Sequence, residues 1–247
     1  MPEALLRPGE RLDDLLLRGM KIIQDPRELC FSLDAVLLGH FAGVQRRAKA
    51  VDLGTGTGVL ALLLAARGAA AVEAIELNPV TADMAARSVA LNGLEAVVRV
   101  HQMDLKDAPR RFSKGSADLV VANPPYCPVS KGEKNRLRGV AAARHELTVT
   151  LAEVVRAAAH FLRFRGRFAM VHLPERLAEI FAALGTSGIE PKRLRLVQPT
   201  REKPPSLALV EGVLGAKPGL RVERSLVVHE PDGRYTAEVA GYWKEAL

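Results

Sequence analysis

The chain has 247 residues, 48% of them hydrophobic, so it can bury a large core in one domain that carries at most short appendages. It contains no run of about 18 uninterrupted apolar residues and no basic N-terminal segment followed by an apolar one, so we expect neither a membrane span nor a secretory signal. Cys30 and Cys127 are too few for a disulfide framework or a four-ligand zinc site, which favours a cytoplasmic protein without a metal.

The net charge is +7, from 35 Lys and Arg against 28 Asp and Glu. Such a field suits a polyanionic partner, nucleic acid before a membrane surface, although many basic proteins bind neither. The excess is uneven, because residues 131–138 hold several of the cations and a second set follows in the C-terminal third. The second set is Lys192, Arg193, Arg195, Arg201 and Lys203.

Residues 1–30 are expected to form a short N-terminal extension, packed on the core as a hairpin with its turn at residues 18–20. Residues 31–247 are predicted to form a single domain. Ser32 and Asp34 are N-terminal signals for a helix that continues through Phe41.

From residue 48 the pattern alternates between short apolar runs and helical spacing. Strands are predicted at 50–53, 71–77, 97–102, 117–122, 167–172, 193–197, 207–212 and 221–228. Helices are predicted at 59–67, 79–92, 147–164, 175–184 and 235–243. Strands that alternate with helices predict an α/β fold, with a mostly parallel sheet covered by helices on both faces.

A glycine-rich loop, Asp52–Gly58, closes the first strand of this region and opens a helix. Its glycines allow a tight turn and a close approach of the backbone to a ligand. The dinucleotide fingerprint G-x-G-x-x-G, counted from Gly54, requires a glycine where this chain has Val59. The spacing therefore speaks against a pyrophosphate at the helix N-terminus.

Two acidic residues end the next two strands. Glu76 is placed to accept hydrogen bonds from both hydroxyls of a ribose, about 20 residues after the glycines. Asp104 could accept from an adenine amino group, with Leu105 as its backbone neighbour. Either carboxylate alone could be a solvated strand end, but the three strand ends together favour an adenosine that lies across the sheet.

The motif Asn123–Tyr126 follows the predicted strand at 117–122, where the double proline ends the strand. The side-chain oxygen of Asn123 and the carbonyl of Pro124 can accept both hydrogens of a planar amino group. Tyr126 offers a flat face for the ring that carries this group. This chemistry requires neither a metal nor a covalent intermediate.

These motifs resemble those of Rossmann-like S-adenosylmethionine-dependent methyltransferases that act on amino nitrogens. With residues 31–38, 143–146 and 232–239, the chain resembles more narrowly the bacterial adenine-N6 methyltransferases that modify valine tRNA next to the anticodon. The resemblance implies a class I methyltransferase fold with an antiparallel strand near the C-terminus. It also implies S-adenosyl-L-methionine as cofactor, S-adenosyl-L-homocysteine as product and tRNA as partner.

Roles for individual residues follow from the same resemblance. The catalytic residues are expected to be Asn123, Pro124 and Tyr126. The cofactor is expected to contact Phe31, Asp34, Asp52, Gly54, Thr55, Gly56, Gly58, Glu76, Leu77, Asp104, Leu105 and Asn123. RNA is expected to contact Lys131, Lys134, Arg136, Arg138 and Arg144.

Other functions remain open from the sequence. A ribosomal-RNA guanine-N2 methyltransferase shares the motifs, as does a release-factor glutamine-N5 methyltransferase, although 30 extended residues are too short for the helical N-terminal domain of the latter. An oxidoreductase is disfavoured by Val59 and by the Asn123–Tyr126 motif. A non-catalytic RNA-binding protein on the same fold is the alternative of a different class.

Overall fold

The structure is a computed structural model that describes residues 5–15, 17–28, 30–124 and 149–243. Several predicted site residues lie outside these ranges, and the structure says nothing of them. They are Tyr126, Lys131, Lys134, Arg136, Arg138 and Arg144.

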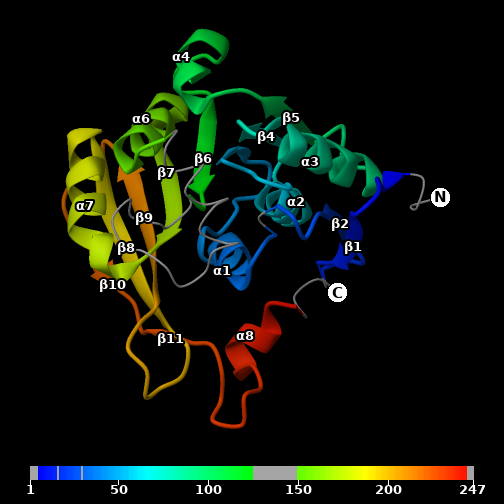
Figure 1. Ribbon diagram of the computed structural model, residues 1–247. Helices are drawn as coiled ribbons and strands as arrows, with labels where there is room; N and C mark the ends of the chain where they lie inside the picture. Colours follow the sequence, from blue (N-terminus) through cyan, green and yellow to red (C-terminus); the bar gives the residue numbers. More distant parts are fainter. Residues whose placement is uncertain (1–4, 16, 29, 125–148, 244–247) are drawn as a thin grey trace.

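A large, mostly parallel sheet forms the centre of the protein (Figure 1). Its strands follow the order β10-β8-β9-β7-β6-β3-β4-β5, and β11 pairs with the same strand as β10. Their bounds are β3 Lys49–Leu53, β4 Ala71–Glu76, β5 Val98–Gln102, β6 Ala117–Ala122, β7 Leu162–His172, β8 Ile189–Gln198, β9 Leu207–Leu214, β10 Arg221–Val222 and β11 Leu226–Val227. Among the described strands of this sheet, β9 alone runs antiparallel to its neighbours. The predicted fold class is confirmed, including the antiparallel strand in the C-terminal part.

Helices cover both faces of the sheet because side chains of a buried strand alternate between the faces. In β6, for example, Val121 joins the apolar cluster under α1 and α2, whereas Val120 joins the cluster under α6 and α7. The longer helices are α1 Leu33–Phe41, α2 Val59–Ala66, α3 Pro79–Leu91, α6 Leu151–Phe161 and α7 Leu177–Thr186. Short ones are η2 Leu105–Asp107, α4 Ala108–Arg111, η3 Pro174–Arg176 and α8 Ala237–Gly241.

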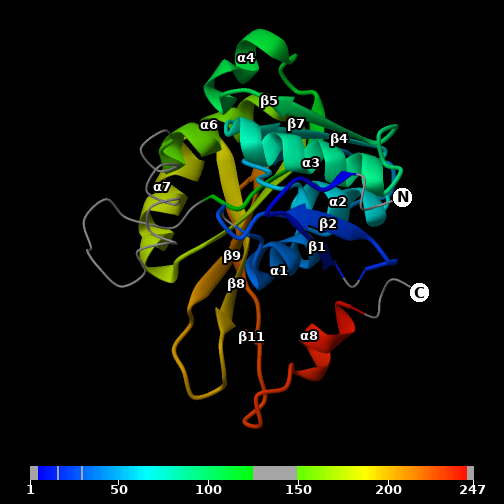
Figure 2. The ribbon, with the colours of Figure 1, turned by 45° about the vertical axis from the view of Figure 1, so that its right-hand side comes forward.

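The N-terminal residues form a hairpin in which β1 (Arg11–Asp14) pairs antiparallel with β2 (Lys21–Gln24). The hairpin lies against α3 (Figure 2), where the backbone N–H of Lys21 donates to Asn92 Oδ1 (3.0 Å) and that of Ile23 donates to Ser88 Oγ (3.0 Å). These bonds give hydrogen-bond partners to two backbone N–H groups of the edge strand β2, which would otherwise be buried without one.

Several predicted elements have different bounds in the structure, among them the strands predicted at 167–172 and 193–197, which begin earlier, at Leu162 and Ile189. Two further differences have a visible cause. The helix predicted to reach residue 164 ends at Phe161, because the apolar Phe164 that extended the pattern is 71% exposed and lies in β7. The strand predicted at 221–228 is two short strands, β10 and β11, along one edge of β8. Between β10 and β11, Arg195 Nε donates a hydrogen bond to the carbonyl of Arg224 (3.0 Å). This side-chain bond interrupts the backbone hydrogen bonds that pair this segment with β8.

No helix in the described part of the chain is both long and apolar enough to cross a bilayer.

Candidate active site

A pocket lies where the carboxyl ends of β3 to β7 meet. It extends to both sides of the boundary between β3 and β6, from which the later strands are added in opposite directions. In open α/β sheets this is the position at which ligands bind. One half of the pocket is formed by the glycine loop and the ends of β4 and β5, and includes Gly54, Gly56, Glu76, Leu77 and Leu105. The other half is formed by the ends of β6 and β7 with α6, and includes Asn123, Pro124, Leu151, Val154, His172 and Arg176.

The glycine loop is held against the end of β4. The backbone N–H groups of Gly54 and Thr55 both donate to the carbonyl of Ile75, at 2.9 and 3.0 Å. Gly56 has φ +57°, and a Cβ added to it would meet no heavy atom within 4 Å, because the loop faces open space there. Gly58 has φ +97° and packs so tightly on α3 that a Cβ would lie 3.2 Å from Ala85 Cβ. The glycines therefore keep one side of the loop open and the other closely packed.

Asp52 supports this loop from below. Its side chain is completely buried and is not among the residues that line the pocket, and Oδ2 accepts a hydrogen bond from Thr55 Oγ1 (2.5 Å). The pKa of Asp52 is raised to about 7, chiefly by burial and in part by the nearby Glu76, although hydrogen bonds from Thr55 and from the backbone N–H of Ala61 lower it. Asp52, predicted to contact the cofactor, therefore does not line the pocket and bonds to the loop instead.

Glu76 lies in the wall of the pocket, with its carboxylate fixed by backbone donors. Oε2 accepts from the N–H of Gly56 (2.8 Å) and Oε1 accepts from the N–H of Asn78 (2.9 Å). Because each carboxylate oxygen has two lone pairs, these bonds leave Glu76 able to accept from hydroxyl groups of a ligand. The position agrees with the predicted contact to a ribose.

The residues that follow β5 have different roles: Leu105 lines the pocket, and Asp104 caps the short helix η2. Leu105 contributes to the pocket wall, next to Met103. Asp104 instead caps η2, since its Oδ1 accepts from the N–H of Lys106 (2.9 Å) and its Oδ2 pairs with Lys106 Nζ (3.2 Å). Asp104 is not among the residues that line the pocket, so its contact with an adenine amino group stays a prediction.

Asn123 and Pro124 follow β6 directly and line the same pocket as the glycine loop. The structure therefore brings together seven of the predicted residues: Gly54, Gly56, Glu76, Leu77, Leu105, Asn123 and Pro124. Thr55 and Gly58 belong to the same loop but are not among the lining residues. Phe31 and Asp34 are not among the lining residues. Phe31 packs on the apolar cluster under α1, and Asp34 lies in the first turn of α1.

Three polar residues of the pocket, Thr81, His172 and Arg176, were not predicted. His172 ends β7 and is 1% exposed, and its Nδ1 accepts the N–H of Leu173 (2.8 Å). Burial and the adjacent Arg176 lower the pKa of His172 to about 4, so the ring is neutral at physiological pH. The rule that a polar residue after a buried strand faces the ligand, which singled out Asn123, also applies to His172.

The pocket fits an adenosine with an attached amino-acid chain. Open space above Gly54 and Gly56 admits a ligand against the backbone, the carboxylate of Glu76 suits ribose hydroxyls, and Leu77 and Leu105 suit the apolar faces of a purine. In the described residues no group of three or more His, Cys, Asp or Glu side chains is placed to hold a metal ion.

Comparison with known proteins agrees with this geometry. Residues 34–179 match the family model of the methyltransferase small domain. Proteins named tRNA1(Val) (adenine(37)-N6)-methyltransferase from Tolumonas auensis and Photobacterium profundum are 33% and 30% identical to this chain. The first alignment covers 88% of this chain and 89% of that protein, and the second covers 85% and 88%. A predicted O-methyltransferase from Agrobacterium tumefaciens has the same fold, with a TM-score of 0.70, 23% identity and coverage of 86% and 96%.

The chain therefore belongs to the methyltransferase small domain family and, with its curated relatives, to the tRNA1(Val) (adenine(37)-N6)-methyltransferases, which makes it an S-adenosyl-L-methionine-dependent methyltransferase.

Proposed function

We propose that this chain transfers the methyl group of S-adenosyl-L-methionine to N6 of an adenine in tRNA, next to the anticodon. The observation that supports this proposal most is that Asn123 and Pro124 line the same pocket as the glycine loop and Glu76. Hydrogen-bond acceptors for an amino group thus lie beside a site suited to the methyl donor. The names of the relatives at 30% identity and above support tRNA as the substrate.

When bound, the cofactor supplies an electrophilic methyl group on a positively charged sulfur and leaves as S-adenosyl-L-homocysteine. The amino nitrogen of adenine is a poor nucleophile, because its lone pair is delocalised into the ring. The side-chain oxygen of Asn123 and the carbonyl of Pro124 would each accept one N–H, which favours a pyramidal nitrogen with its lone pair directed at the methyl group. As positive charge develops on nitrogen these two bonds strengthen, so they stabilise the transition state more than the ground state.

The new C–N bond uses the nitrogen lone pair, and the electrons of the broken C–S bond remain on sulfur. The methylated nitrogen then loses one of its protons to water. Since the amine product is only transiently charged, no general base among the described residues is required.

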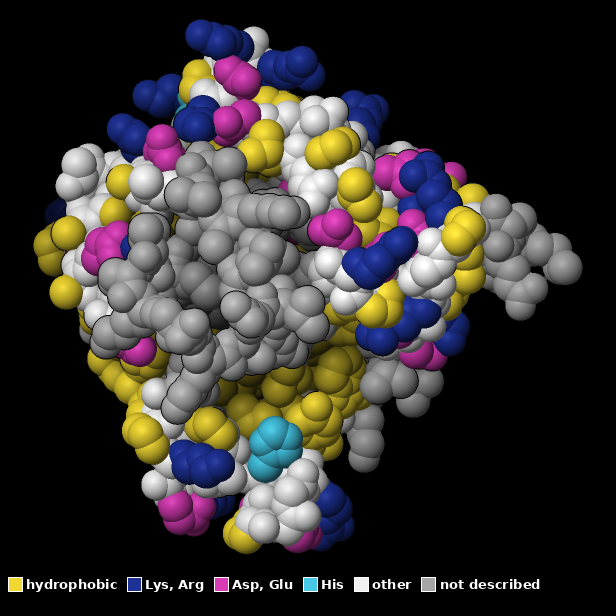
Figure 3. Space-filling view, in the orientation of Figure 1, with side chains coloured by type: hydrophobic (Ala, Val, Ile, Leu, Met, Phe, Trp, Pro, Cys, Tyr) yellow, Lys and Arg dark blue, Asp and Glu magenta, His cyan; other side chains and the backbone are white. Residues whose placement is uncertain are grey.

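Contacts to RNA are proposed from the sequence. Tyr126 would stack on the target base, and Lys131, Lys134, Arg136, Arg138 and Arg144 would contact phosphates. On the described face of the protein, Lys and Arg side chains lie mainly around the margin, and apolar side chains gather in its lower half (Figure 3). A cytoplasmic location, where tRNA is modified, completes the proposal.

The test compares methyl acceptors directly. The purified chain is incubated with S-adenosyl-L-methionine labelled in its methyl group and, separately, with total tRNA, ribosomes and a release factor. Label in tRNA supports the proposal, label in ribosomal RNA supports a guanine-N2 enzyme, and label in the release factor supports a glutamine-N5 enzyme. No transfer, together with no heat in a calorimetric titration with the cofactor, would identify a non-catalytic RNA-binding protein.

A further inference from the structure

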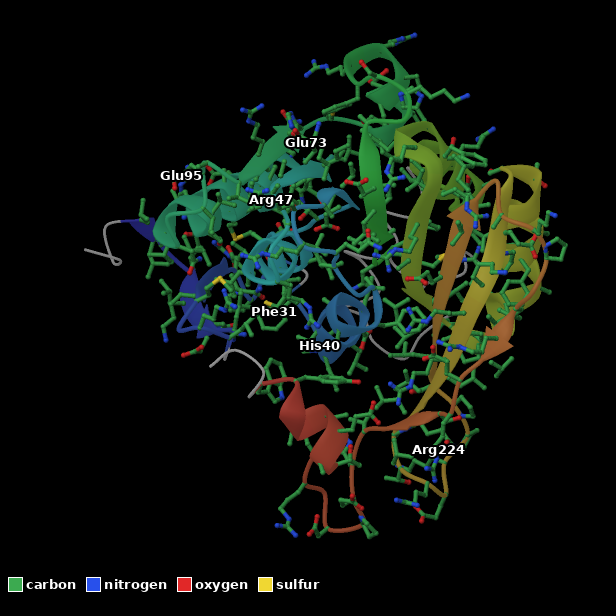
Figure 4. The ribbon with its side chains drawn as sticks, turned by 180° about the vertical axis from the view of Figure 1, so that it is seen from behind. Phe31, His40, Arg47, Glu73, Glu95 and Arg224 are labelled. Carbon is green, nitrogen blue, oxygen red and sulfur yellow. The ribbon has the colours of Figure 1, made fainter. Side chains whose placement is uncertain are left out.

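One buried amide links the N-terminal hairpin to the cofactor side of the pocket. Gln24 is the last residue of β2, and its side chain is completely buried. Its Nε2 donates to Thr57 Oγ1 (3.0 Å), and its Oε1 accepts the backbone N–H of Phe31 (3.1 Å). A single side chain thus bonds to the glycine loop and to the segment that leads into α1, in which Figure 4 labels Phe31.

The bond to Thr57 acts on the part of the loop that faces the ligand. Thr57 is 3% exposed and lies between Gly56, which lines the pocket, and Gly58, which packs on α3. Gly56 has a positive φ, and in the described part of the structure its N–H bonds to Glu76 alone. Because glycines do not hold their own conformation, the polar bonds of Thr57 and Gly56 help to fix the shape of the loop, together with those of Gly54 and Thr55.

A second bond ties the same N-terminal segment to the residues that follow β4, in the same half of the pocket as the glycine loop. Asn78 Nδ2 donates to Glu28 Oε2 (3.4 Å), and the backbone N–H of Asn78 donates to Glu76 (2.9 Å). Residues 24–28 therefore contact both the glycine loop and the residue that fixes the ribose-facing carboxylate.

The hairpin does not depend on Gln24 to stay in place. At its far end Asn92 Oδ1 accepts the N–H of Lys21 (3.0 Å) and Asn92 Nδ2 donates to the carbonyl of Lys21 (2.7 Å). This anchor lies on the C-terminal end of α3 and makes no contact with the pocket-lining residues described above. Gln24 thus bonds the hairpin to the glycine loop, whereas Asn92 and Ser88 hold it at the C-terminal end of α3.

We infer that Gln24 is a positioning residue for the methyl donor: it acts through Thr57 to hold the glycine loop in its ligand-binding shape. The inference concerns the cofactor site alone and holds whichever molecule accepts the methyl group. A buried amide–hydroxyl bond is the means, because loss of either partner leaves the other polar group buried without its bond. The bond to Phe31 sets the orientation of the amide, so that nitrogen faces the loop.

The experiment measures the dissociation constant of S-adenosyl-L-methionine by calorimetry, with urea unfolding as the measure of stability. Gln24→Leu and Thr57→Val should each weaken cofactor binding about tenfold, as expected when a loop loses one buried hydrogen bond. Thr57→Ser keeps the hydroxyl and should bind within about twofold of the unchanged chain. Asn92→Ala is the matched control, because it should lower stability while leaving cofactor affinity unchanged.

The double variant Gln24→Leu/Thr57→Val decides how Gln24 acts. If Gln24 acts through Thr57, the double variant should bind S-adenosyl-L-methionine as tightly as the single variant with the lower affinity. Additive losses would overturn the inference, as would a folded Gln24→Leu protein with normal affinity. Equal losses of affinity in Asn92→Ala and Gln24→Leu would also overturn it, since the effect would then belong to hairpin docking in general. If Gln24→Leu does not fold, the comparison of Thr57→Val with Thr57→Ser tests the same bond.

Discussion

The backbone N–H of Gly56 donates to Glu76 Oε2 at 2.8 Å, so the carboxylate at the end of β4 holds the glycine loop that follows β3. The two residues are 20 positions apart in the chain, and their strands are hydrogen-bonded neighbours. Glu76 therefore lines the pocket and also fixes the loop.

Glu76→Gln should weaken binding of S-adenosyl-L-methionine by at least about tenfold, because the amide keeps one acceptor oxygen and turns an N–H donor toward a backbone N–H. Calorimetric titration measures the change. Glu73→Gln is the matched control, because Glu73 lies on the same strand but pairs with His101 Nε2 (2.5 Å) and does not line the pocket. Equal affinity in the two variants would contradict the role given to Glu76.

Gly56→Ala should abolish measurable cofactor binding at micromolar concentrations, because its methyl group would enter the pocket. Gly93→Ala provides the control for backbone strain. Gly93 also has a positive φ, +65°, and a Cβ there would meet no heavy atom within 4 Å, but it follows α3 away from the pocket. Both variants should lose about 1–2 kcal/mol of stability, since an L-residue is strained in this conformation. Cofactor binding in Gly56→Ala as tight as in Gly93→Ala would show that the loop does not contact the ligand.

The buried His172 should make stability depend on pH. Its folded-state pKa of about 4 lies below the usual 6.5, so the unfolded chain binds a proton that the folded chain cannot. The contribution of His172 to the free energy of unfolding is complete above pH 6.5. As pH falls toward 4 the protein loses at most roughly 3 kcal/mol of this stability. His40 shifts in the same direction and Asp52 in the opposite one, so only a comparison isolates His172. Urea unfolding at pH 7 and 4.5 should show a smaller loss in His172→Asn, and equal losses would contradict this prediction.

Replacing Lys134, Arg136 and Arg138 by Gln should weaken tRNA binding and flatten its dependence on salt. Each phosphate contact that is lost reduces the slope of log affinity against log salt concentration by about 0.7 to 0.9. The control replaces Arg46, Arg47 and Lys114 by Gln. These exposed cations precede β3 and β6, at the strand ends opposite the pocket (Figure 4 labels Arg47). An unchanged slope in the first variant would remove segment 131–138 from the RNA interface.

The position of the site could be predicted from the sequence because parallel strands bring their carboxyl ends to one edge of the sheet. The glycine loop, Glu76, Leu105 and Asn123 each lie at or just after the end of a parallel strand, and the sheet order brings these strand ends to one pocket. A glycine loop and a carboxylate that are far apart in the chain could thus be assigned to one ligand.

Contacts that depend on long-range packing could not be predicted in the same way. Gln24 ends a short strand, where a polar residue ordinarily faces solvent, and only the docking of the hairpin on α3 buries it against Thr57. Local hydrogen bonds also compete with ligand contacts, as when the carboxylate of Asp104 caps η2. The apolar pattern extended α6 too far because Phe164 is exposed on the surface.

The most direct test of the proposed function is mass spectrometry of nucleosides from tRNA after a single turnover with this protein or with Asn123→Ala. We expect N6-methyladenosine from the unchanged chain, and from Asn123→Ala the same product about 10²–10³ times more slowly, at an unchanged affinity for S-adenosyl-L-methionine. Asn123→Asp, which keeps a side-chain acceptor, should retain more of the rate than Asn123→Ala. Methylation at a different atom, or a near-normal rate in Asn123→Ala, would contradict the account.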